Sequence, residues 1–223
     1  MMPLPTNDMR IQAVTQLGPL GELRIRTLED LKDLREVYRL THNCYVTSGY
    51  CASERSGLII HYPQYDHVPE TMTLLADRLG RVAGSISVTE DGPMGFTMDE
   101  DFKAACDEVR SEGRKIAAIW RLVVAESERS QRLVVLGMMR TMIDWMLERE
   151  IATALFVVNP RHESVYRRLL NAEQIAYREE TQGLKNAPGI LLRFDPAQLP
   201  RNSPLYPERK SVVVHRLMLD TAC

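Results

Sequence analysis

The chain has 223 residues, of which 44% are hydrophobic and 26% charged, an ordinary composition for a globular protein. Its formal net charge of -2 provides no global basic field of the kind that binds nucleic acid. No run approaches the ~20 apolar residues needed to span a bilayer, so we expect no stable membrane insertion. The length favours one domain, which we place at 22–199, between an N-terminal arm (1–21) and a C-terminal extension (200–223).

The cysteines form neither a CxxC pair nor a cluster with His at metal-ligand spacing. Residues 1–16 also lack the basic and then apolar segments of a signal peptide. We therefore predict reduced thiols, no bound metal and a cytoplasmic location. No cysteine has sequence neighbours that indicate a nucleophile. The four are Cys44, Cys51, Cys106 and Cys223.

Strand and helix patterns alternate along the chain. Residues 116–125 form a nearly continuous apolar run, which predicts a buried central strand. Residues 43–68 are irregular and rich in tyrosine, and long irregular segments tend to line sites. The order indicates an α+β or α/β three-layer sandwich with a mixed sheet and a right-handed crossover over 116–158. The other expected elements are strands 11–17, 22–26, 71–77, 81–89, 153–158, 175–179, 190–194 and 211–219, and helices 28–42, 100–113, 132–149 and 160–170.

The turn ESERSQR, from Glu126 to Arg132, joins the central strand to the longest helix. Free backbone N–H groups at a helix N-terminus form an anion site, and Arg129 and Arg132 would add positive charge for a phosphate. The turn has no glycine, and a solvated charged turn explains the same residues.

The segment NPRHESVY follows a buried strand and begins a helix. His162 and Tyr166 are four residues apart and share a helical face, where the two side chains could transfer protons. In the alternative interpretation Tyr166 packs on the sheet and His162 caps the first turn. The pattern alone favours this structural role for His162.

Tyr65, Asp66 and His67 precede the predicted hairpin, with Glu70 nearby. An Asp beside a His provides a tuned base, although an exposed charged loop is the commoner outcome. Metal binding by His61, His67 and Asp66 would lack a recognisable spacing.

Arg121 interrupts the apolar run of the central strand. A buried Arg requires an anionic partner, which is either an acid of the protein or a substrate carboxylate. The methionines of the longest helix favour a core position, and some of them could instead line an acyl tunnel. These methionines are Met138, Met139, Met142 and Met146.

Several segments together resemble the N-acyl amino acid synthases. They are VYRLTHNCYVTSGY, GRVAGSISVTEDGPMG, NPRHESVYRRLLNAEQI and LKNAPGILLRFD, and the resemblance covers about residues 30–196. It implies a GNAT-like three-layer αβα sandwich with a mixed, mostly antiparallel sheet. It also implies transfer of a long acyl chain from acyl carrier protein to the amine of an amino acid, tyrosine in the best-known members. The acyl-phosphopantetheine would be a donor substrate, with no bound cofactor.

The chain departs from the related acyl-homoserine lactone synthases in its charged residues. Those enzymes carry an Arg, an acid, a second Arg and a Glu where this chain has Thr41, Pro63, Ser87 and Ala118, whereas Tyr45, Asp66 and Arg121 match their pattern. The loss of acids disfavours a sulfonium acceptor, and we expect an amino acid with a neutral side chain. Arg121 would then pair with Asp66 or with the acceptor carboxylate.

The resemblance also implies catalytic roles. Tyr166 matches the tyrosine that protonates the leaving thiolate in many GNAT enzymes, and the backbone N–H near Val123 would hold the thioester carbonyl. Without the strand Glu, the base would be Glu70, Glu90, His67 or a water relay.

The donor arm and the carrier protein would contact basic residues at one end of the sheet. Asn159, Arg161 and His162, together with Arg129 and Arg132, are the expected contacts of the phosphopantetheine arm. Acidic carrier protein would dock on a basic face. Two other functions fit the sequence, an acetyl-CoA-dependent N-acetyltransferase and a non-catalytic acyl- or carrier-binding module. The residues expected in the basic face are Arg129, Arg132, Arg140, Arg161, Arg167 and Arg168.

Overall fold

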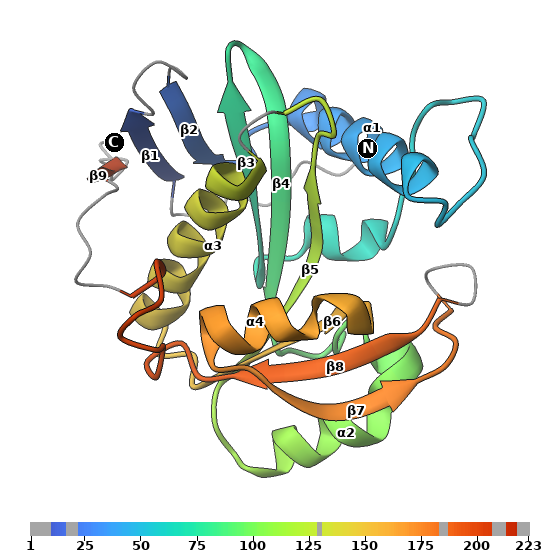
Figure 1. Cartoon of the computed structure of the whole chain (residues 1–223), viewed down its shortest axis with the longest axis vertical. Coiled ribbons are helices and arrows are strands. Elements are labelled where there is room, and N and C mark those ends of the chain that lie inside the picture. Colours follow the sequence, from blue (N-terminus) through green and yellow to red (C-terminus); the bar gives the residue numbers. More distant parts are fainter. Residues whose placement is uncertain (1–9, 17–21, 129–130, 183–186, 207–212, 218–223) are drawn as a thin grey trace.

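The computed structural model describes residues 10–16, 22–128, 131–182, 187–206 and 213–217. These residues form one nine-stranded sheet (Figure 1). β5 and β6 pair in parallel, and every other neighbouring pair is antiparallel, which confirms the predicted mixed, mostly antiparallel sheet. In spatial order the strands are β7 (Glu173–Arg178), β8 (Gly189–Phe194), β6 (Thr153–Val158), β5 (Ile116–Val124), β4 (Arg81–Glu90), β3 (Thr71–Arg78), β2 (Glu22–Thr27), β1 (Arg10–Gln16) and β9 (Val213–Leu217).

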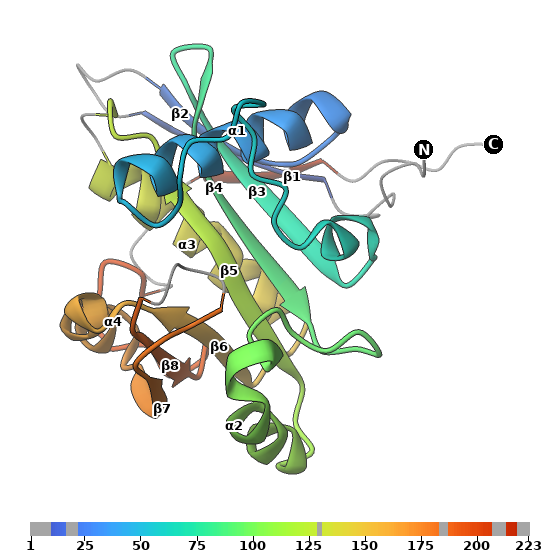
Figure 2. The ribbon, with the colours of Figure 1, turned by 90° about the vertical axis from the view of Figure 1, so that its right-hand side faces the viewer.

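Helices cover both faces of this sheet. In Figure 1, β4 and β5 run between α3 (Gln131–Glu148) on the left and α1 (Leu31–Thr47) on the right. In Figure 2, α1 and α2 (Asp99–Ser111) lie toward opposite ends of β5. α4 (Glu163–Leu170) packs with α3 on one hydrophobic core, whereas α2 covers a second, smaller core on the other face. The arrangement is the predicted αβα sandwich.

α1 begins later than its sequence pattern predicts. Thr27, the residue before the predicted start of this helix, continues β2 and pairs with Leu74 of β3. The side chain of Asp30 caps the helix instead, accepting from the backbone N–H of Asp33 at 2.8 Å. The predicted helix 160–170 is also divided, into the 3-10 turn η3 (Pro160–His162) and α4.

α3 is buried against the sheet by its methionines. Met138, Met139, Met142 and Met146 are at most 2% exposed, which confirms the core position. The helix approaches β4 closely at Gly84, where an added Cβ would lie 2.9 Å from the Met138 side chain. A larger residue at this position would push α3 away from the sheet.

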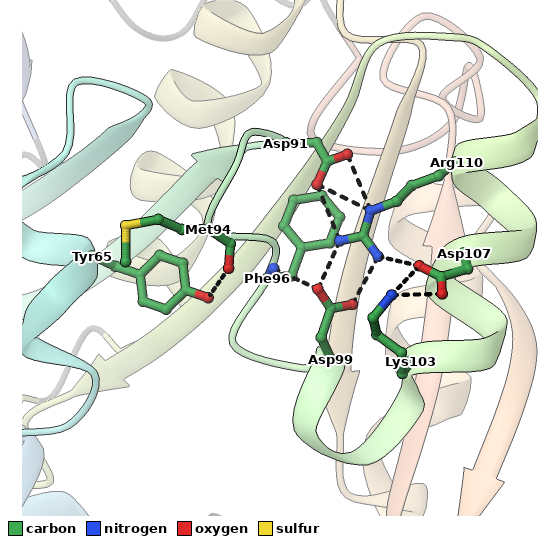
Figure 3. A network of polar contacts seen from close by, with 8 residues as sticks. All are labelled: Tyr65, Asp91, Met94, Phe96, Asp99, Lys103, Asp107 and Arg110. Carbon is green, nitrogen blue, oxygen red and sulfur yellow. Dashed lines mark hydrogen bonds and ion pairs between the residues drawn. The ribbon is translucent and has the colours of Figure 1, made fainter.

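The loop between β4 and α2 is fastened by Arg110 (Figure 3). Its guanidinium donates to Asp91 at 3.0 Å and to Asp99 at 2.7 Å, and it lies 4.7 Å from the centroid of the Phe96 ring. Asp99 also accepts from the backbone N–H of Phe96 at 2.8 Å. The Tyr65 hydroxyl donates to Met94 O at 3.2 Å, which joins the same loop to the segment before β3.

We expect Arg110→Gln to lower the free energy of unfolding by about 2 kcal/mol, because two partly buried carboxylates lose a charged donor. Denaturant unfolding measures the change. Lys103→Gln is the control, since Lys103 makes an exposed ion pair with Asp107 and should change stability little. Equal effects of the two substitutions would contradict the role of Arg110.

Candidate active site

β5 and β6 diverge near the middle of the sheet. Their pairing extends from Ile116 and Thr153 to Ile119 and Phe156, and β5 then continues without β6. A pocket of about 270 Å³ occupies the divergence. Its walls come from the end of α1, the facing strands, α3, α4 and the segment before β8. The lining residues are Tyr45, Tyr50, Ile86, Ile119, Trp120, Arg121, Leu122, Met139, Phe156, Val157, Val158, Asn159, His162, Tyr166, Leu170, Thr181, Pro188 and Gly189.

A β-bulge lies beside this pocket. Ser87 pairs with Trp120 and Ser85 pairs with Val123, so Ile86 faces two residues of β5. One of them, Arg121, has a left-handed φ of 52°. An Arg rarely adopts this conformation, so surrounding contacts must hold it there.

Those contacts are the side-chain partners of Arg121. The guanidinium donates to Asp66 at 2.5 and 3.3 Å and to Ser87 at 3.0 and 3.2 Å. The Arg121 and Asp66 side chains are only 1% and 2% exposed. Of the two partners expected for Arg121, the structure therefore shows the acid of the protein.

Tyr38 of α1 completes this buried network. Its hydroxyl donates to Asp66 Oδ2 at 2.7 Å, and burial together with this carboxylate raises the pKa of Tyr38. The Arg121 guanidinium lies 4.3 Å from the Trp120 ring centroid. The network thus joins α1, the 3-10 turn η2 (Pro63–His67) and the bulge of β5 into one unit.

Aromatic rings line one end of the pocket. The Tyr45 ring meets Tyr50 edge-on at a centroid distance of 5.9 Å and His61 at 6.4 Å. Tyr62 is 4.0 Å from His61 and 6.1 Å from Trp120. Burial raises the pKa of Tyr45 to about 12. The sequence indicated His61 only as a possible metal ligand, because its contact with Tyr45 forms only in the folded chain.

Tyr166 lies on the opposite wall of the pocket. Its ring packs edge-on against Phe156 at 5.0 Å, and burial raises the pKa of its hydroxyl. A hydroxyl whose pKa is raised keeps its proton at neutral pH, as a general acid must.

The residues of η3 lie at the same pocket. Asn159 and His162 are lining residues, and Asn159 Oδ1 accepts from the backbone N–H of Arg161. Arg161 donates to the Tyr50 hydroxyl at 3.0 Å and to His162 Nε2 at 3.1 Å, thereby connecting the two sides of the pocket. Burial, followed by the charge of Arg161, lowers the pKa of His162.

The three residues predicted as the base lie outside the pocket. None of them is a lining residue of the pocket. Glu90 pairs with Arg149 at 2.7 Å, and the side chain of Glu70 lies near Gly92. His67 has a buried Nδ1 without a hydrogen-bond partner among the described residues. The structure therefore does not bring these bases to Tyr166.

The bulge also determines which N–H groups of β5 face the pocket. The N–H of Ala125 donates to Ala83 O at 2.8 Å, and N–H directions alternate along a strand, so the N–H of Val123 also points toward β4. The backbone N–H groups of Leu122 and Val124 point away from β4, toward the side on which β5 and β6 no longer pair. Leu122 lines the pocket and Val123 does not.

The turn after β5 is only partly described. Arg129 lies outside the described residues, and Arg132 is exposed in the first turn of α3. The Gln131 side chain donates to Ala125 O at 3.0 Å, and Arg78 and Glu128 form an ion pair. Within the described ranges, no group of three or more His, Cys, Asp or Glu residues is suited to a metal ion, and no helix is long and apolar enough to cross a membrane.

Comparisons with known proteins give a family and a fold. The family model for the N-acyl amino acid synthase FeeM matches residues 36–195. The solved structure of FeeM, an N-acyl amino acid synthase from uncultured soil microbes, is 21% identical with a TM-score of 0.67, covering 78% of this chain and 90% of that chain. No curated protein sequence matches.

Two homoserine lactone synthases have similar folds. The acyl-homoserine lactone synthase LasI is 18% identical with a TM-score of 0.56, covering 78% of this chain and 89% of that chain. The CoA-dependent synthase BjaI, solved with SAM and isopentyl-CoA, is 19% identical with a TM-score of 0.56, covering 74% and 77%. At these identities the likeness concerns the fold.

Proposed function

Because the chain belongs to the family of the N-acyl amino acid synthase FeeM and is therefore an N-acyltransferase, we propose that it acylates the amine of an amino acid, with tyrosine as the acceptor. The donor in this proposal is a long-chain acyl-phosphopantetheine on acyl carrier protein, and the reaction takes place in the cytoplasm. The observation that carries it is the largely apolar pocket between β5 and β6, with Tyr166 in its wall.

The apolar part of the pocket suits an acyl chain. Leu122, Met139, Phe156 and Leu170 contribute aliphatic or aromatic surface to it. Burying each methylene of the donor contributes about 0.8 kcal/mol. Our proposal assigns the contact with the thioester carbonyl to the backbone N–H of Leu122 and not to that of Val123. The Leu122 N–H faces the pocket and can donate to the developing oxyanion.

The other part of the pocket suits a neutral acceptor. Its described lining contains no Asp or Glu, so it offers no carboxylate to a sulfonium. Arg121 is bound to Asp66 and is not available to recognise a charged side chain. Tyr45, Tyr50 and Trp120 present aromatic faces and edges, against which a phenol ring can pack.

The proposed reaction is a direct transfer. The amine nitrogen attacks the thioester carbon, the C–S bond breaks, and Tyr166 protonates the departing thiolate. No described cysteine lines the pocket. Burial raises the pKa of the Cys44 thiol and raises that of Cys106 to about 12, which disfavours a thiolate nucleophile.

Mass spectrometry of lipid extracts tests the function. Bacteria expressing the chain should contain new N-acyl amino acids that are absent from an empty-vector control, and their masses identify the acyl chain and the acceptor. Purified protein with tyrosine should then consume acyl-acyl carrier protein faster than the same acyl-CoA. N-acetyl products formed only from acetyl-CoA would instead identify a short-chain acetyltransferase.

We expect the carrier protein to dock beside α3 and α4. Arg132 and Arg168 are exposed there, whereas Arg140 and Arg167 make ion pairs with Asp144 and Glu163. Reversing the charge of both exposed residues, to Glu, should raise the KM for acyl-acyl carrier protein at least about tenfold, because the carrier is acidic.

The same double substitution should leave kcat/KM for a free acyl-pantetheine thioester nearly unchanged. Arg114→Glu is the matched control, since Arg114 is exposed just before β5 begins, at the other end of that strand. A KM for the carrier donor that stays constant in the double variant would rule out this docking face.

A further inference from the structure

His61 lies in the irregular segment between α1 and η2. Its ring stacks on Tyr62, with centroids 4.0 Å apart and planes inclined by 32°. On another side it meets Tyr45, whose ring is 6.4 Å away and inclined by 71°. Tyr45 lines the pocket and His61 does not, so the imidazole lies beside a residue of the pocket wall.

The ring nitrogens of His61 have no hydrogen-bond partner in the part of the chain that the structure describes. No described residue hydrogen-bonds to either nitrogen, and neither is among the buried polar atoms that lack a partner, so both remain accessible to solvent. His42 and His162 differ in this respect. His42 Nε2 accepts from the backbone N–H of Glu54 at 3.0 Å, and His162 Nε2 accepts from Arg161.

The surroundings keep the His61 imidazole neutral. Burial, and then the positive charge of Arg121, lower its pKa to about 4. Tyr45 and Tyr62 are uncharged at neutral pH, since the pKa of each hydroxyl is raised. The Tyr62 hydroxyl donates to Glu100 at 2.8 Å, which connects this group of rings to a carboxylate. A neutral imidazole retains a lone pair that can accept a proton.

We propose that His61 is the general base of the acyl transfer, removing the proton of the attacking amine through one water, since its ring lies beside the pocket wall. This inference rests on the proposed function. The acceptor reacts as the free amine, having lost its ammonium proton to solvent, and it forms the C–N bond first, which places a positive charge on nitrogen in the tetrahedral intermediate. His61 takes one proton from that nitrogen, and collapse of the intermediate expels the thiolate, which is protonated by Tyr166.

A weakly basic imidazole can serve here because the proton is removed from the tetrahedral intermediate and not from a free ammonium ion. The nitrogen of the tetrahedral intermediate is a much stronger acid than a free ammonium ion, because it is bonded to the carbon that carries the oxyanion and the sulfur. The residue that takes this proton can therefore be less basic than one that must deprotonate a free ammonium ion. This accounts for a synthase in which Ala118 stands on the central strand and no Asp or Glu lines the described pocket.

The test compares His61→Ala and His61→Gln with His67→Gln, which removes the neighbouring predicted base. Both His61 variants should lose about 10²–10⁴-fold in kcat with little change in the KM of the acceptor. Added imidazole should restore turnover to His61→Ala, which a purely structural role would not permit. Hydroxylamine should lose less rate than the amino acid in the same variant, because its nitrogen is the stronger acid in the tetrahedral intermediate and can lose its proton to water.

The kinetics of these variants distinguish His61 from His67 as the base. Wild-type turnover in His61→Gln, or a loss and imidazole rescue confined to a His67 variant, would overturn the assignment of His61. Thermal unfolding of each variant shows whether a lost activity reflects a lost fold, and rescue of His61→Ala supports the base independently. If the wild-type protein itself forms no N-acyl amino acid, the proposed function fails, which is distinct from failure of His61.

Discussion

Replacing Asp66 with alanine should destabilise the fold by about 3–5 kcal/mol, because it leaves the Arg121 guanidinium buried without its anion. The same change removes the acceptor of the Tyr38 hydroxyl. The bulge of β5 should loosen as well, since Arg121 retains its left-handed φ only while its side chain is held. Denaturant unfolding with a two-state fit measures the loss of free energy.

Two further variants separate the buried charge from packing. Asp66→Leu combined with Arg121→Met removes both charges, and we expect it to recover much of the stability lost in Asp66→Ala. Tyr38→Phe removes one hydrogen bond to Asp66 and should lower the free energy of unfolding by about 1 kcal/mol. If Asp66→Ala were as stable as the wild type, the Arg121–Asp66 ion pair would not contribute to the free energy of unfolding as we expect.

Tyr166→Phe should lower kcat at least about 10²-fold, because the thiolate would leave without a proton donor. The KM values should change little, since the ring that packs on Phe156 is retained. Because the pKa of Tyr166 is raised, the wild-type rate should also persist to a pH above the ordinary range for tyrosine. Steady-state kinetics over a range of pH measure both effects.

The choice of leaving group provides a sharper version of this test. An aryl thioester releases a thiolate that needs no proton, so Tyr166→Phe should affect it much less than an alkyl thioester. Tyr177→Phe is the control, because Tyr177 is 52% exposed on β7, outside the pocket lining. An equal loss with both thioesters would assign Tyr166 to binding or packing instead of acid catalysis.

Local sequence patterns determined most of the fold. The apolar run 116–125 predicted the central strand, which the structure shows as Ile116–Val124, and the alternation of strands and helices predicted the sandwich. These predictions succeed because side-chain periodicity and turn residues act within a few positions of each other. The segments that resemble the N-acyl amino acid synthases indicated the family for the same reason, since each is a continuous piece of chain.

Tertiary structure decided how the site is assembled. The sequence indicated that Arg121 needs an anion, but the partner, Asp66, is 55 positions away. Glu90, a predicted base, is instead paired with Arg149, 59 positions away. Such partners depend on strand register and on how η2 and α3 pack on the sheet, and neither is written in local periodicity.

The bulge in β5 illustrates the same limit at the scale of a single residue. One extra residue opposite Ile86 changes which N–H groups of β5 face the pocket, and for this reason our proposal assigns the thioester contact to Leu122, where the sequence predicted Val123. His61 joins Tyr45 only because the irregular segment folds back on α1. The sequence by itself thus determined the family and most of the elements and predicted Tyr166 as a site residue. The folded chain determined which polar groups meet, because those contacts join residues that are close only in space.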